Sequence, residues 1–188
     1  MKKIIISILL VTSVIFAKNN AEININNNTL ELSGEYYLDN NSYIMLSFLN
    51  TQDKKNRIEN ERNDQQLISA GFKILNSYIH NDNIKFGLGM KSIWVKNYKD
   101  DFTTIPLSFY LKYLITENIE LDFNFNYGTN VLTFFDGKKY QETMIKANYK
   151  IIDKSYIYLG GRYIETKYDD SSVLTFDDNI FFGYKIIF

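Results

Sequence analysis

The stretch Ile180-Phe181-Phe182-Gly183-Tyr184-Lys185-Ile186-Ile187-Phe188 stands at the end of the sequence. Every second residue counted back from Phe188 is apolar or aromatic, which is the period of a β-strand with one continuous apolar face. Core strands rarely stop on an exposed aromatic residue, whereas the closing strand of an outer-membrane barrel commonly does. The stretch therefore predicts a closing strand. Four of its positions fit the spacing of a barrel assembly signal: Gly183, Tyr184, Ile186 and Phe188.

The same alternation continues through most of the chain. In the stretch 119–127 every odd position is apolar or aromatic and every even position is acidic or an amide. The stretch 141–151 also separates two faces, with Ile145, Ala147, Tyr149 and Ile151 on one and Glu142, Lys146, Asn148 and Lys150 on the other. A helix would spread these charges over its whole surface, whereas a strand separates them onto one face. The sequence has 15 Tyr and 14 Phe but only one Pro, which favours β-structure.

The connections between these segments alternate between short and long. Short ones fall near residues 39–41, 79–82, 116–118 and 153–154, and long or polar ones span 51–64, 97–101, 134–139 and 169–172. Outer-membrane barrels have short periplasmic turns and longer external loops. The sequence therefore predicts an all-β fold, a closed antiparallel up-and-down transmembrane β-barrel in the outer membrane of a Gram-negative cell.

The alternation of loops also predicts the number of strands. If the last strand runs towards the periplasm, the strand near 29–38 does so too, and an upward strand has to precede it. The stretch 20–26 is the candidate, with a hairpin turn at Asn27-Asn28, residues that tolerate the positive φ of such turns. We expect ten strands. Eight remains the alternative, with the first hairpin outside the closed sheet.

The first residues have the layout of a secretory signal peptide. Two lysines precede an apolar run from Ile4 to Phe16, and Ala17 follows. That run is short for a membrane-spanning helix. We expect a signal peptide at 1–17 and one barrel domain at 18–188.

The composition limits the classes of partner that the protein could bind. Residues 18–188 hold 19 basic residues (21 less Lys2 and Lys3) and 22 acidic ones, a balance that argues against nucleic acid. The mean hydropathy of −0.24 would suit a soluble protein, but barrel strands expose only alternate residues to lipid. The main alternative is a soluble periplasmic β-barrel that binds an apolar ligand, with its apolar faces turned inward.

In the membrane orientation the polar faces point into the barrel. Charges there are costly unless paired, so we expect a lumen filled by ion pairs, with a structural or at most narrow-pore, porin-like role. Wide pores need roughly sixteen strands or more. The expected network comprises Glu120, Asp122, Glu142, Lys91, Lys112, Lys146, Arg162 and Lys185. Aromatic residues near strand ends predict two interfacial girdles: Tyr36, Tyr37, Trp94, Tyr98, Phe102, Tyr127, Tyr163 and Tyr168.

Little in the sequence indicates catalysis. The one histidine, His80, falls in a predicted turn, and there is no cysteine. The hydrolases among small outer-membrane barrels generally need a histidine base. We therefore expect no enzyme activity, no catalytic residues, no cofactor and no metal. An envelope lipid-modifying enzyme is the weaker alternative. The carboxylate pair Asp177-Asp178 is interpreted as solvated loop charge.

One block resembles a known family. Tyr127-Gly128, Val131–Phe134, Asp136-Gly137, Tyr140–Glu142 and Tyr158–Tyr163 together are similar to the YfaZ-type outer-membrane proteins. The resemblance implies a signal peptide and an outer-membrane barrel, and it brings no reaction or catalytic residues. Expected partners are outer-membrane lipid, lipopolysaccharide and, during biogenesis, the assembly machinery, for a monomeric protein. Within the block we expect Glu142 and Arg162 to lie on neighbouring strands and to pair.

Overall fold

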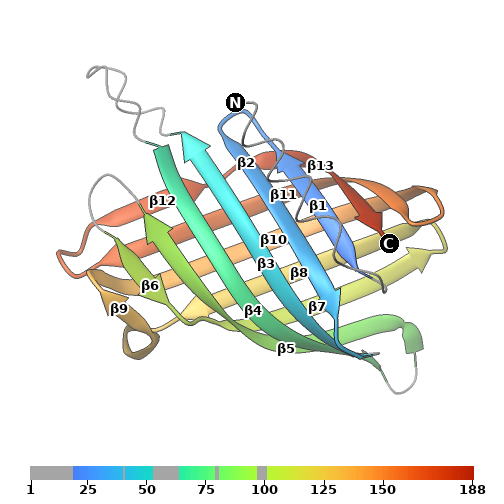
Figure 1. The fold of residues 1–188 in the computed structure, drawn as a ribbon, viewed down its shortest axis with the longest axis horizontal. Helices are drawn as coiled ribbons and strands as arrows, with labels where there is room; N and C mark the ends of the chain where they lie inside the picture. The colour runs from blue at the N-terminus through green and yellow to red at the C-terminus, as the bar shows by residue number, and fades with distance from the viewer. Residues whose placement is uncertain (1–18, 40, 53–63, 79–80, 97–100) are drawn as a thin grey trace.

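Ten long strands form one closed sheet. A computed structural model describes residues 19–39, 41–52, 64–78, 81–96 and 101–188. The strands are β1 (Asn20–Ile25), β2 (Thr29–Tyr37), β3 (Ser42–Gln52), β4 (Asp64–Tyr78), β5 (Asn81–Lys96), β7 (Leu107–Thr116), β8 (Ile119–Gly128), β10 (Gly137–Ile152), β11 (Ser155–Tyr168) and β13 (Ile180–Ile187). Each pairs antiparallel with its neighbours in the order β4-β3-β2-β1-β13-β11-β10-β8-β7-β5, and β5 returns to β4 (Figure 1). The prediction of ten strands is confirmed, and the eight-stranded alternative is wrong.

The two ends of the barrel differ. One end, here called the turn end, holds the connections 117–118 and 153–154, the ends of β2 and β4, the starts of β3 and β5, and the residues Asn20 and Phe188. The opposite, loop end carries the longer connections and four extra elements. These are β6 (Phe102–Thr104), the 3₁₀ turn η1 (Asn130–Leu132), β9 (Thr133–Phe135) and β12 (Val173–Asp177). β6 pairs with β5 and β9, and β12 pairs with β11, so the sheet extends beyond the ring at this end.

Two of the turns are stabilised by hydrogen bonds from backbone N–H groups to a side chain, rather than by residues with a positive φ. Asn26 Oδ1 accepts hydrogen bonds from the backbone N–H groups of Asn28 (2.8 Å) and Thr29 (2.7 Å), which is an Asx turn. Neither Asn27 nor Asn28 has a positive φ, so that part of the hairpin prediction is wrong. In the turn after β2, the backbone N–H groups of Asn41 and Ser42 donate to Asp39, and these bonds lower the pKa of its exposed carboxyl group.

The first and last strands close the ring. β1 and β13 pair over their whole common length, from Asn20 opposite Ile187 to Ile25 opposite Phe182. The backbone N–H of Phe188 adds a 2.8 Å bond to the carbonyl of Asn19. The prediction that the weakly patterned stretch 20–26 is the partner of the closing strand is confirmed.

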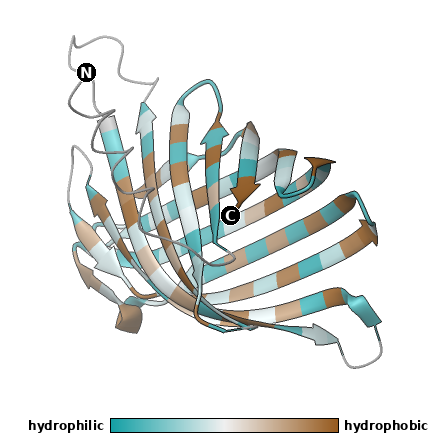
Figure 2. Cartoon of the chain, turned by 45° about the vertical axis from the view of Figure 1, so that its right-hand side comes forward, coloured by the Kyte–Doolittle hydropathy of each residue, from teal (hydrophilic) through white to brown (hydrophobic). Residues whose placement is uncertain are grey.

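The apolar face of the strands points outward. Hydrophobic and hydrophilic residues alternate along the strands in Figure 2, and the apolar ones of each alternating stretch are the exposed ones. On β13, Ile180 is 72% and Phe182 56% exposed, whereas the intervening Phe181 and Lys185 are buried. The same alternation holds on β11, where Leu159 is exposed and Tyr158 is buried. A soluble barrel with an apolar interior would require the reverse orientation, so this arrangement contradicts that alternative.

Some predictions cannot be compared with the described residues. The expected signal peptide (1–17), His80 and Tyr98 all lie outside them. Across the described ranges, the fold includes no helix with the length and apolar character needed to traverse a bilayer.

Candidate functional site

Ion pairs fill the middle of the barrel. Each charged residue of this group makes at least one pair within 4 Å, and all of them have largely covered side chains. The acidic members are Glu22, Glu31, Glu35, Glu120, Asp122, Glu142 and Asp177, and the basic members are Lys73, Lys91, Lys112, Lys146, Arg162 and Lys185. With seven acids against six bases, the described interior is close to neutral.

Many of these pairs join strands that are not neighbours. Lys91 on β5 binds Glu142 on β10 at 2.6 Å, although β7 and β8 lie between them in the sheet. Lys146 on β10 binds Glu22 on β1 at 2.7 Å, across β11 and β13. Such contacts have to cross the interior, so these side chains fill the space inside the ring rather than line its wall.

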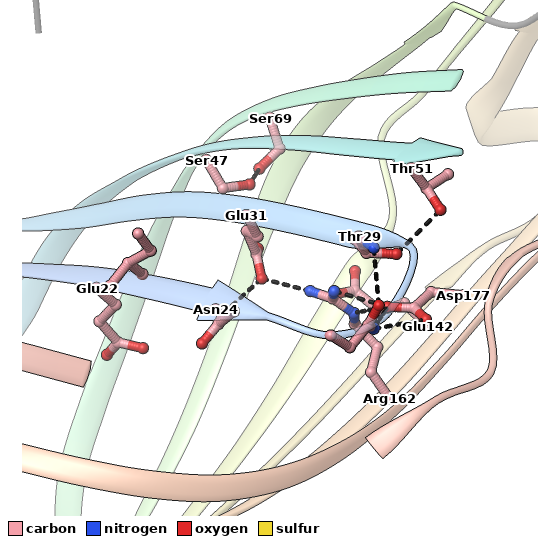
Figure 3. Close-up of polar contacts among 12 residues, drawn as sticks. Glu22, Asn24, Thr29, Glu31, Ser47, Thr51, Ser69, Glu142, Arg162 and Asp177 are labelled. Carbon is pink, nitrogen blue, oxygen red and sulfur yellow. Dashed lines mark hydrogen bonds and ion pairs between the residues drawn. The ribbon is translucent and has the colours of Figure 1, made fainter. Parts of the chain in front are cut away.

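Arg162 is the most completely enclosed cation (Figure 3). Its Nε and Nη2 donate to Asp177 Oδ2 at 2.9 and 2.7 Å, and its Nη1 donates to Glu31. Asn24 also donates to Glu31, at 2.7 Å, and the guanidinium lies 5.2 Å from the centre of the Phe181 ring. Arg162 therefore joins β11 to β2 and β12, with both of its carboxylate partners held inside the protein.

A second group lies nearer the turn end. Lys112 on β7 binds Glu120 (2.9 Å) and Asp122 (3.5 Å) on β8, and Lys185 on β13 approaches Glu120 at 3.6 Å. Asp122 also lies 3.9 Å from Lys146. Each carboxylate is shared by two lysines, so the group is a connected network in which pairing offsets the cost of burial.

The structure places all eight residues of the expected charge network in the interior, but with some unexpected partners. Glu142 and Arg162 do lie on neighbouring strands, yet Glu142 pairs with Lys91, and Arg162 with Glu31 and Asp177. Asp177, interpreted above as solvated, is only 2% exposed. Asn179 and Asn26 both donate hydrogen bonds to Asp177, and no pattern in the sequence indicated that its carboxylate is held inside the barrel.

An apolar cluster fills the interior at the loop end. Its members are Leu49, Leu67, Ile93, Val95, Phe102, Tyr140, Ile164, Tyr168 and Phe176, each less than 5% exposed. Leu67 belongs to β4 and Ile164 to β11, which are five strands apart in either direction around the ring. This loop-end cluster therefore extends from one side of the barrel to the other.

Two aromatic residues of the cluster were expected elsewhere. Phe102 and Tyr168 were assigned to the interfacial girdles, but their rings pack edge to face inside the barrel, 5.7 Å apart. Tyr36, Trp94, Tyr127 and Tyr163 do lie outward and exposed. The girdle prediction is wrong for Phe102 and Tyr168, because Tyr168 continues the inward face of β11 that also carries Arg162 and Ile164, and Phe102 is buried on β6. It is also wrong for Tyr37, whose ring packs against the buried Tyr43 with 4.1 Å between the ring centres.

Two cavities inside the barrel are small and polar. A cavity of about 90 Å³ is lined mainly by charged and amide side chains, among them Glu31, Lys91 and Asn126. A second one, of about 40 Å³, lies beside Lys73 and Asp122. Pockets that hold organic ligands are typically about 300–1,000 Å³ and mostly apolar. These cavities fit a few water molecules instead.

Gly183 makes room for an interior aromatic residue. It lies directly opposite Tyr158, whose hydroxyl donates to Asn24 and to Glu22 (3.2 Å). A Cβ atom on Gly183 would overlap the Tyr158 ring. Of the other predicted assembly-signal positions, Tyr184 faces outward and bonds Ser155 (3.1 Å), and Phe188 is exposed. The role of these four residues in assembly stays a prediction.

Replacing Gly183 with alanine should lower the free energy of unfolding by about 1–3 kcal/mol, the usual cost of overpacking. Gly161 is the matched control, because it faces outward and a Cβ there would meet its nearest neighbour only at 4.0 Å. Urea unfolding of both variants in the same detergent measures the difference. Equal stability of the two variants would show that Tyr158 moves aside without cost.

The described interior shows no arrangement typical of a catalytic centre. No group of three or more His, Cys, Asp or Glu residues within it is placed to hold a metal ion. Its carboxylates are engaged by lysine or arginine, as given above. The arrangement joins strands across the interior through paired charges and an apolar cluster.

Comparison with known proteins identifies the fold. No family model matches the chain, and no curated protein matches its sequence. Among solved structures, the outer-membrane protease OmpT from Escherichia coli superposes with a TM-score of 0.57 at 10% identity, covering 91% of this chain and 93% of that one. The outer-membrane channel DcaP of Acinetobacter baumannii gives 0.46 at 10% identity, covering 89% and 54%, so the chain spans about half the length of DcaP. The NanC porin gives 0.44 at 10%, covering 90% and 97%. The chain has the fold of an outer-membrane β-barrel.

Proposed function

We propose that the protein is an integral outer-membrane barrel with a structural role, closed to solutes in its resting state. The observation that carries the proposal is the loop-end cluster, which extends across the ring between β4 and β11. Below it, the ion-paired lumen ties distant strands to one another. The outward apolar faces and the likeness to outer-membrane barrels support the location in the membrane.

In this role, the charged interior holds the barrel in shape. A ring of ten strands leaves an interior that side chains can fill, unlike the aqueous channel of larger barrels. Pairs such as Lys91–Glu142 act as struts across that interior, because they hold β5 and β10 at a fixed separation. We therefore infer that the network maintains the shape of the barrel against lateral pressure from the membrane.

A narrow pore is the second candidate. The polar cavity of about 90 Å³ lies among Glu31, Lys91 and Asn126. A water path through the barrel would need the loop-end cluster to move, and also the smaller buried cluster of Tyr43, Leu75 and Tyr110. Single-channel recording in planar bilayers separates the two roles. The purified full chain should give no discrete current steps, with heat-modifiable gel mobility as the control for folding. Reproducible steps from the folded wild-type protein would favour the pore.

We further propose that the protein is not an enzyme and that it is related to the YfaZ-type proteins. The likeness to a protease extends to the fold alone at 10% identity. Several residues of the YfaZ-like block build the interior: Tyr140 donates to Glu142 at 3.0 Å, and Arg162 holds two carboxylates.

A further inference from the structure

Two lysines face each other on the outside of the barrel near its loop end. Lys139 on β10 and Lys167 on β11 are paired directly in the register, so their Cβ atoms are about 4.5–5.5 Å apart. Both continue the outward face of their strands, to which Ile145 and Leu159 also belong. Like charges in this relation destabilise a sheet. Neither lysine makes an ion pair with any residue the structure describes, so the repulsion calls for an anion from outside.

The lysines lie at the depth of lipid headgroups. Tyr127, an outward residue of the predicted girdle, is opposite Gln141, and Lys139 is two residues further towards the loop end. Two residues are about 7 Å along a strand, or about 5 Å along the membrane normal at a tilt of about 40°. The headgroup layer on each side of a bilayer is about 5–7 Å thick. The ammonium group of Lys139 lies 5.1 Å from the centre of the Tyr127 ring, which positions it at this boundary.

On the membrane side of the lysine pair, the register places one carboxylate against the two cations. Glu165 is the nearest outward carboxylate in the register, opposite Gln141 and two residues before Lys167. It accepts a hydrogen bond from the hydroxyl of Tyr163 and forms no ion pair with either lysine in the described structure. On the neighbouring strand, Val173 is opposite Lys167 and Thr175 is opposite Glu165. Two further exposed carboxylates, Asp136 and Asp169, lie on the other side of the pair, towards the loop tips, where the Asp169 N–H donates to the Asp136 carbonyl. On the membrane side, two cations against one carboxylate beside an exposed valine suit an anionic headgroup attached to acyl chains.

We propose that Lys139 and Lys167 bind the phosphate group of an outer-leaflet lipid. The phosphate lies between the two ammonium groups, Tyr127 and Tyr163 border it on the membrane side, and the acyl chains cover the apolar band below. The proposal rests on the barrel being embedded in the membrane, but not on whether its lumen is closed.

Binding of lipid A to the full chain in an uncharged detergent tests the proposal, with native mass spectrometry as the readout. Each basic residue near a membrane surface contributes about 1 kcal/mol, which is about fivefold in affinity. We expect about fivefold weaker binding for Lys139→Gln and for Lys167→Gln, and about 25-fold for the double variant. Glu165→Gln should bind more tightly, because a repelling carboxylate is removed.

Three controls make the result specific. Lys96→Gln removes another lysine at the loop end of the outward face, but one whose opposite residue is Gln66, and it should change affinity less than twofold. Phosphatidylcholine should bind all variants alike. Heat-modifiable mobility shows that each variant is folded. Unchanged lipid A binding by the folded double variant would overturn the proposal, and displacement of lipid A by millimolar inorganic phosphate would show a free-phosphate site instead. A conducting wild-type protein would leave this result unaffected.

Discussion

Replacing Arg162 with leucine should lower the free energy of unfolding by about 3–5 kcal/mol, the cost of removing one member of a buried ionic group. The Arg162 side chain is 1% exposed, and it binds Asp177 twice and Glu31 once. Its removal leaves two carboxylates without a cation in an interior closed towards the loop end by apolar residues. Urea unfolding followed by the fluorescence of Trp94, the single tryptophan, measures the loss.

A surface ion pair provides the matched control. Lys150 binds Asp153 at 2.8 Å, but the Asp153 side chain is 93% exposed, so Lys150→Leu should cost less than about 1 kcal/mol. Adding Glu31→Gln and Asp177→Asn to Arg162→Leu should restore part of the stability, because the unpaired charges are removed. A loss below about 1 kcal/mol for Arg162→Leu would mean that water reaches both carboxylates, which would contradict a filled interior.

The architecture could be predicted from the sequence because its determinants are local. A period of two fixes which residues share a face, and the lengths of successive connections fix which end each turn occupies. Parity then required an upward strand before β2, and β1 supplies it. The ion pairs could not be predicted in this way. Lys91 and Glu142 meet across the ring, and such a contact depends on closure, tilt and side-chain length, none of which a single strand encodes.

The loop-end cluster did leave a signal in the sequence. A strand with one lipid-facing side and one polar side has no two consecutive apolar residues. The pairs Phe48-Leu49 and Leu67-Ile68 and the triplet Ile93-Trp94-Val95 break this rule at the loop ends of their strands. The stretch Tyr43–Leu46 and the pair Ile74-Leu75 break it near the turn end. Doubled apolar residues in barrel strands therefore indicate apolar side chains inside the barrel at those positions, and Tyr43 and Leu75 do form a smaller interior cluster with Tyr110. The packing of Phe102, Tyr168 and Phe176 onto the doubled residues at the loop end depends on the extra strands β6 and β12.

Opening the loop-end cluster should convert a silent barrel into a conducting one. Phe102 and Tyr168 contact each other edge to face at the centre of the cluster, and both are fully buried. The double variant Phe102→Ala, Tyr168→Ala removes both rings, and the space that they leave adjoins the polar interior around Glu142 and Arg162. Water entering from the loop end would then meet charged side chains rather than an apolar layer. We expect discrete current steps in planar bilayers where the wild-type protein gives none.

The loss of stability caused by the double substitution has to be separated from its effect on conductance. Truncating buried aromatic residues costs about 3–5 kcal/mol each, so folding of the double variant is checked by its heat-modifiable mobility before recording. Phe134→Ala is the matched control, because Phe134 lies next to the cluster on β9 but is 47% exposed; it should stay silent. A folded double variant that also stays silent would show that ion pairs such as Lys91–Glu142 close the barrel without the cluster. The ion-pair network would then be the barrier to ions, since it crosses the same ring nearer the turn end.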